Sequence, residues 1–210
     1  TTFNVVPLSG VQGWEQIALD RWRFELTPGG RFHNGENWNA EAAAMEIDWK
    51  SDPAHGHSSF SYTGPAEAEV VDDLTVDVVC ENACPIFPRT AFLITFQAPQ
   101  WFASASDAAR ASTTVGFGPY KMIGDGLGWR PGLDVTMEAY DNYVPNALSP
   151  NDSRAPSIDE IVMIWRGEAF VRAAMVQVGE ADWAFDLGLD QQNDVPVFDH
   201  GGAAETFVNV

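Results

Sequence analysis

The side chains best suited to bind or transform a small molecule lie near the C-terminal end of the chain. Trp183 and Phe185 are separated by a single alanine, and Asp186 follows directly. An aromatic ring can cover the face of a peptide or a sugar, and a carboxylate can pair with an amine. These three residues are therefore candidate ligand contacts. The alternative is that both rings fill a core while Asp186 lies in a solvated turn.

Histidine-containing segments offer acid–base or metal chemistry. His33 is a possible general base, but no serine or cysteine nucleophile lies in a recognisable local motif. A histidine beside a tight turn more often bonds backbone groups, so we favour a structural role. Asp52, His55 and His57 can coordinate a metal, yet no fourth ligand lies nearby in the sequence, which favours a solvated loop. The sequence predicts no catalytic residue, no metal and no cofactor.

The chain has two cysteines, Cys80 and Cys84. Their spacing suits a small disulfide loop in an oxidising compartment and differs from the spacing of redox and zinc pairs. Two unrelated buried thiols are the alternative. We expect the disulfide.

The charge balance is strongly acidic, with 30 Asp and Glu against 11 Lys and Arg and a net charge of −19 over 210 residues. Such a surface repels phosphate backbones and anionic membranes, so no nucleic acid is expected as a partner. A surface this acidic and poor in lysine resembles proteins of high-salt organisms, where ions screen the self-repulsion. Acidic residues that simply keep a secreted protein soluble are the alternative. No apolar run is long enough to predict a transmembrane helix.

The elements expected in the first half are strands, tight turns and one helix. Residues 21–26 alternate between apolar and charged side chains, which is typical of a half-buried strand. Asn34 and Gly35 favour a tight hairpin turn, and Asn39 can cap a helix over residues 39–50. Residues 67–79 predict a hairpin of an antiparallel sheet. The apolar face of the helix is expected to hold Ala42, Met45 and Trp49.

The last third of the chain predicts a strand, a helix and a second strand. Residues 158–165 are an almost continuous apolar run, typical of a strand buried on both faces of a sheet. Helical spacing follows from Glu168 to Val178, and a short strand covers residues 181–185. Short loops between these elements predict a right-handed βαβ unit with parallel strands over residues 158–185. Ligands bind at the carboxyl ends of such strands, which is where the aromatic and acidic candidates lie.

Two segments of the chain resemble a known family. WRFELTPGGRFHNGENWNAE (residues 22–41) and TVGFGPYK (residues 114–121) are similar, in this order, to segments of the peptide/nickel-type extracellular solute-binding proteins. These proteins serve ABC importers and are related to the oligopeptide- and dipeptide-binding proteins. Phe117 stands where the family most often has a threonine, and it joins Trp183, Phe185 and Asp186 as a candidate ligand-binding residue.

The resemblance implies a mixed α/β (α+β) fold of the type II periplasmic-binding-protein kind, present in part. Residues 1–113 would form an antiparallel peripheral subdomain, and residues 114–210 would form part of the main ligand-binding lobe. The second lobe would be absent from this chain.

The function that the resemblance implies is capture of a solute, most commonly a peptide, by closure of two lobes. The captured solute would pass to an ABC permease in the membrane, and the protein would not be an enzyme. It would be periplasmic or extracellular, with a lipid anchor possible in the full-length protein. A secreted hydrolase or carbohydrate-active domain is the alternative, and the many carboxylates and eight tryptophans favour it only generically.

Overall fold

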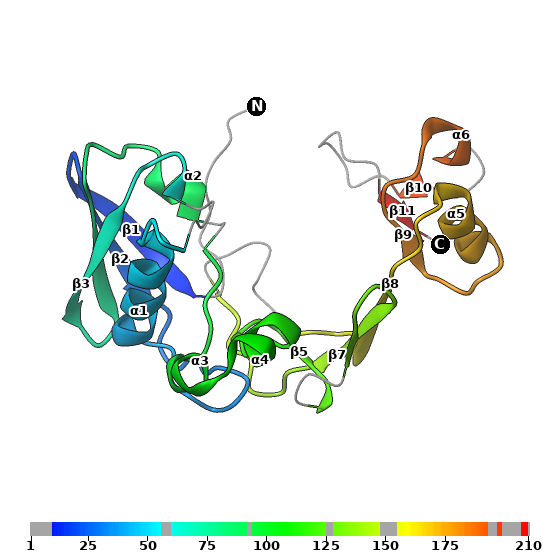
Figure 1. Ribbon diagram of the computed structural model, residues 1–210, viewed down its shortest axis with the longest axis horizontal. Coiled ribbons are helices and arrows are strands. Elements are labelled where there is room, and N and C mark those ends of the chain that lie inside the picture. The colour runs from blue at the N-terminus through cyan, green and yellow to red at the C-terminus, as the bar shows by residue number, and fades with distance from the viewer. Residues whose placement is uncertain are drawn as a thin grey trace. The chain divides into compact units, whose positions relative to one another are not determined.

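The computed structural model divides into two compact units, and each is described by itself. Unit 1 comprises Thr1–Trp129 and Thr136–Val162, and unit 2 comprises Arg130–Val135 and Met163–Val210. Figure 1 labels most of the helices and strands of both units, with β4 and β6 left without a label. The residues that the structure describes are 10–55, 60–91, 94–124, 128–147, 155–192, 197–198 and 207–209.

A four-stranded antiparallel sheet forms the centre of unit 1, with the strand order β1-β2-β4-β3. The strand over residues 21–26 and the hairpin over residues 67–79 are found where the sequence predicts them. The first strand has no clear sequence signal, because two register shifts interrupt its pairing and break the alternation of its side chains. The four strands are β1 (Val11–Ala18), β2 (Arg21–Leu26), β3 (Ala66–Asp72) and β4 (Thr75–Cys80).

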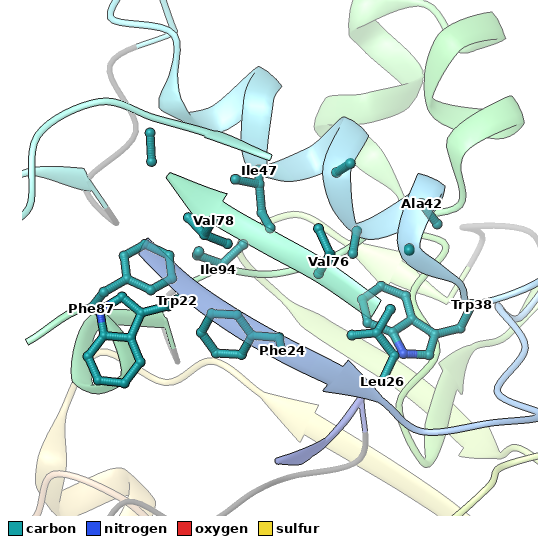
Figure 2. Packing of buried hydrophobic residues seen from close by; sticks show 14 of the residues in the cluster. Trp22, Phe24, Leu26, Trp38, Ala42, Ile47, Val76, Val78, Phe87 and Ile94 are labelled. Carbon is teal, nitrogen blue, oxygen red and sulfur yellow. The ribbon is translucent and has the colours of Figure 1, made fainter. Parts of the chain in front are cut away.

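Helix α1 (Ala40–Ser51) covers one face of this sheet and closes the main core. The Asn39 side chain accepts a hydrogen bond from the Ala42 N–H, so the predicted helix and its cap are confirmed. Figure 2 shows side chains of β2 and β4 facing those of α1. The alternating residues of β2 that the sequence predicts to be buried are all inside: Trp22, Phe24 and Leu26.

The buried face of α1 differs from the predicted one. Trp49 is 37% exposed, whereas Glu46 and Lys50 are buried. The Lys50 ammonium lies 2.9 Å from a carboxylate oxygen of Glu46 and also hydrogen-bonds Thr95. Mutual charge compensation therefore allows two charged side chains to occupy a face that a hydrophobicity pattern assigns to apolar residues.

The two segments that carry the family resemblance pack together in unit 1. Phe32 and Trp38 flank the tight turn at Gly35, whose φ is +91°, and both aromatic rings are buried. The Phe117 ring stacks on Trp38 with centroids 4.4 Å apart and meets Phe32 edge-on at 5.4 Å. The backbone N–H of His33 donates to the Gly116 carbonyl oxygen at 2.7 Å. Aromatic residues of the two family-like segments therefore form one cluster.

A second sheet contains four strands from the middle of the chain. β5 pairs with β7 in antiparallel fashion, and β6 and β8 are further neighbours of β7. Three short helices precede it in the chain: α2 (Phe87–Thr90), α3 (Pro99–Ser104) and α4 (Asp107–Ser112). The strands are β5 (Tyr120–Met122), β6 (Trp129–Arg130), β7 (Asp134–Ala139) and β8 (Glu160–Ile164).

From residue 165 onward, the described residues of unit 2 form two helices and a small antiparallel sheet with the order β10-β11-β9. Helix α5 ends at Gln177 with Val178 as its C-cap, and Gly179 follows with a φ of +76°, the left-handed conformation common just after a helix. Ala173 and Val176 of α5 form a small core with Leu187. The elements are α5 (Ala169–Gln177), β9 (Trp183–Ala184), α6 (Leu189–Gln192), β10 (Val197–Phe198) and β11 (Phe207–Asn209).

The strand–helix–strand order over residues 158–185 is present, but its pairing differs from the predicted parallel unit. Within the described part of the chain, β8 pairs with β7 while β9 pairs antiparallel with β11, so the two strands belong to different sheets. The apolar run is also not buried on both faces, because Val162 is 48% and Trp165 is 49% exposed. Local sequence indicates where a strand forms, whereas its partner depends on which backbone edge is free. The subdomain boundary after residue 113 stays a prediction, because residues 114–129 lie in unit 1 with the preceding segment.

Candidate functional site

Two of the sequence candidates form an aromatic pair at the surface of unit 2. The rings of Trp183 and Phe185 meet edge-to-face, with centroids 4.1 Å apart. The exposed fractions are 43% for Trp183 and 47% for Phe185. In this chain the pair is a partly exposed apolar surface, and the alternative in which both rings fill a core does not describe it.

Asp186 follows the pair in a backbone conformation that is uncommon for a residue with a side chain. Its φ is +54°, and it is the one non-glycine residue with a positive φ among the described residues. Aspartate tolerates the left-handed region better than most residues, because its short polar side chain can bond locally. Here the side chain is fully exposed, so its carboxylate is accessible from solvent, and it forms a long ion pair of 3.8 Å with Arg172.

A residue that the sequence reasoning missed, Arg172 of α5, binds the backbone around this site. Its Nε–H donates to the Phe185 carbonyl oxygen at 3.0 Å, and Nη2 donates to the Asp186 carbonyl oxygen. Nη1 donates to the carbonyl oxygens of Arg166 at 2.6 Å and Gly167 at 2.9 Å. The loop after β8 and the loop after β9 are therefore joined by one guanidinium group. The available signal was that Arg172 is the only charged residue in α5.

Phe117, the fourth candidate, lies in unit 1 and the other three lie in unit 2. It is partly buried and packs against Phe32, Trp38 and Phe96 at the side of the main core. The structure therefore gives this ring a packing role, and contact between Phe117 and a ligand stays a prediction.

His33 has the structural contacts that the sequence favours. Its Nε2 lies 3.0 Å from the Gly118 carbonyl oxygen, and its ring meets Tyr140 edge-on at 4.9 Å. Its Nδ1 is buried without a hydrogen-bond partner among the described residues. Burial lowers the pKa of His33 below its ordinary value, because the charged imidazolium loses hydration there. The ring therefore fixes the 116–118 segment to the tight turn.

The residues considered for a metal have other contacts where they are described. The His55 ring stacks on Trp49 with centroids 3.9 Å apart, and Asp52 accepts a hydrogen bond from the Ala54 N–H. His57 lies outside the described residues. Within the described ranges, no group of three or more His, Cys, Asp or Glu side chains is placed to hold a metal ion.

The structure joins Cys80 and Cys84 in a disulfide, and both residues are buried. The Cys84 N–H donates to the Leu19 carbonyl oxygen, and the Trp22 indole N–H donates to the Cys84 carbonyl oxygen. The disulfide loop is thereby attached to the turn between β1 and β2.

The fold defines a class of protein: a mixed α/β chain like part of the type II periplasmic binding proteins. The chain is similar to OppA of Burkholderia pseudomallei, with a TM-score of 0.72 and 20% identity over 88% of this chain and 38% of that one. It is also similar to the ABC transporter substrate-binding protein CtaP of Listeria monocytogenes, with a TM-score of 0.68 and 17% identity over 83% and 35% of the two chains. At these identities the likeness shows the fold.

The family is shown by sequence. The model of the bacterial extracellular solute-binding proteins, family 5 Middle, matches residues 7–202, and the chain belongs to this family. The glutathione-binding protein GsiB of Pectobacterium atrosepticum is 27% identical over 176 residues, which is 80% of this chain and 31% of that protein. GsiB of Escherichia coli K12 is 29% identical over 177 residues, with the same coverage. The chain therefore spans about a third of the length of these relatives. None of the described helices is long and apolar enough to cross a membrane.

Proposed function

We propose that this chain forms one side of a clamp that captures a small peptide for an ABC importer. The observation that carries the proposal is the partly exposed Trp183–Phe185 pair, followed directly in the chain by the fully exposed Asp186 side chain. Membership of a solute-binding family supports it, and so do relatives named for binding glutathione, which is itself a small peptide.

The chemistry of the site suits an amine with an attached apolar group. The aromatic pair offers apolar area at low entropic cost, because each ring is held by few rotatable bonds. Asp186 offers a negative charge in a position that a ligand ammonium can reach. The mechanism is binding and release by relative motion of two lobes, with no covalent bond made or broken. No arrangement in the described part of the chain favours the hydrolase alternative.

The partner of such a clamp is a permease in the membrane, and the compartment is periplasmic or extracellular. The disulfide supports an oxidising compartment, because such bonds persist outside the reducing cytosol. A lipid anchor in the full-length protein belongs to the same proposal.

One side of a clamp binds weakly, because the contacts from the opposing lobe are missing. We expect millimolar or weaker binding of dipeptides to the 210-residue chain, on the order of the affinity of a single small contact surface. Isothermal calorimetry that gave tight binding would contradict the one-sided clamp. Turnover of ester, peptide or glycoside reporters would contradict a purely binding role.

The site itself is tested by NMR titration with an aromatic dipeptide and with its N-acetylated form. We expect the Trp183 indole resonance to shift with the free amine and much less with the acetylated peptide. Phe185→Ala and Asp186→Ala should each reduce the shift, whereas Tyr62→Ala, which removes an aromatic ring that is 72% exposed in unit 1, should not. Equal shifts for the chain and both site variants would refute the assignment.

A further inference from the structure

We infer that Arg172 is the positioning residue of this site. Its guanidinium group hydrogen-bonds the loop after β8 and the loop after β9 and so holds them together. Its ion pair with the Asp186 carboxylate is long, at 3.8 Å, and leaves that carboxylate exposed to a ligand. The role of Asp186 in capture rests on the function proposed above, whereas the holding of the loops follows from the hydrogen bonds alone.

The hydrogen bonds use almost the full donor capacity of the side chain. A guanidinium group has five N–H donors in one plane, and four of them are directed at carbonyl oxygens here. Two acceptors, Arg166 and Gly167, belong to the loop after β8. The other two, Phe185 and Asp186, belong to the loop after β9. Neither loop can move away without breaking two of these bonds.

This arrangement explains why Asp186 stays accessible next to an arginine. The Arg172 Nη2 lies 3.8 Å from the Asp186 carboxylate oxygen, which is too long for a hydrogen bond. The same nitrogen donates to the Asp186 backbone oxygen instead. A carboxylate beside an unused guanidinium would form a bidentate pair and lose its acceptor sites. Because four of the five donors are directed at carbonyl oxygens, Arg172 makes only this long ion pair with the Asp186 carboxylate, which stays exposed to a cation.

The backbone bond also supports the left-handed conformation of Asp186. A φ of +54° persists in a non-glycine residue when surrounding contacts hold it. Arg172 makes such a contact from a helix that is itself anchored by Ala173 and Val176 in the small core of unit 2. The Arg172 side chain is 18% exposed, so most of its own surface is covered by the chain, although the carbonyl oxygens that it bonds lie at the surface.

Lysine cannot replace this side chain, because one ammonium group cannot reach four carbonyl oxygens in two loops. Arg172→Lys in the 210-residue chain therefore keeps the positive charge and removes the planar set of N–H donors that reaches both loops. Arg130→Lys is the matched control, because Arg130 lies in the same unit and pairs with the Asp134 side chain instead of backbone carbonyls.

Hydrogen exchange followed by mass spectrometry tests the inference without any ligand. We expect Arg172→Lys to raise exchange at least tenfold in both segments 165–167 and 185–187, with β2 and β4 unchanged and no such effect in the control. Unchanged exchange, or an increase in one loop only, would overturn the inference. The experiment can fail while capture by Asp186 holds, and it can succeed while peptide binding fails.

A measurement on the unsubstituted chain keeps the inference testable if Arg172→Lys does not fold. The Nε–H of Arg172 donates to a carbonyl oxygen, whereas the only hydrogen bond described for the Arg166 side chain comes from Nη1. Nitrogen-15 NMR should therefore show the Arg172 Nε–H exchanging with water at least tenfold more slowly than that of Arg166. Equal rates would overturn the inference.

Discussion

Replacing Lys50 by methionine should destabilise unit 1 more than any loss of a surface charge. Glu46 is fully buried, and Lys50 is the cation next to it at 2.9 Å. Without Lys50, the carboxylate keeps one hydrogen bond, from the Gln97 backbone N–H at 3.2 Å, and loses its charge compensation. Removing one partner of a buried pair costs about 3–5 kcal/mol, and the remaining hydrogen bond points to about 3 kcal/mol here. That is a large share of the free energy of unfolding of a typical protein, which is about 5–15 kcal/mol.

Most of this loss of stability should be recovered when both charges are removed together. The double variant Glu46→Gln, Lys50→Met keeps both side-chain volumes and leaves no buried charge, so we expect it to cost about 1 kcal/mol. Urea denaturation at neutral pH measures the free energy of unfolding of each variant. Lys121→Met is the control, because the Lys121–Glu138 pair is well exposed and should contribute little. A double variant as unstable as Lys50→Met alone would refute the reasoning.

Three further predictions concern acid, redox and salt. Because the pKa of His33 is lowered, its contribution to stability is complete above the ordinary value of 6.5 and declines as pH falls below it. The melting temperature should therefore drop from about pH 7.5 to about pH 5, and His33→Gln should reduce that drop. The same dependence of melting temperature on pH in the variant and the unsubstituted chain would contradict this role of His33. Reduction should add two hydrogens to the mass of the chain, and replacing both Cys80 and Cys84 by alanine should cost about 2 kcal/mol, since the closed loop is short. An unchanged mass would mean that no disulfide forms. If the net charge of −19 reflects adaptation to salt, the melting temperature should rise steeply from low to molar salt, and a flat curve would remove that hypothesis.

The candidate site was only partly readable from the sequence. Trp183, Phe185 and Asp186 are sequence neighbours at the end of a short strand, so their closeness required no knowledge of the fold. Arg172 bonds carbonyl oxygens on both sides of it in the chain, from five to fourteen residues away. Backbone carbonyls have no sequence signature, since every residue carries one. The sequence therefore offered only a weak signal for Arg172, as the one charged residue of α5, and none for the carbonyl oxygens that it bonds.

By itself the sequence determined the local elements of this protein and its family. The strand at residues 21–26, the cap at Asn39 and the turn at Gly35 depend on side-chain alternation, a capping oxygen and a φ that glycine tolerates, all of which are local properties. Only the tertiary structure decided which strands pair outside the predicted 67–79 hairpin and which charges are buried. β8 lies beside β7 because backbone hydrogen bonds join strands that are distant in the chain. Lys50 is buried against Glu46 because the helix turns both side chains to the same side, where each compensates the charge of the other.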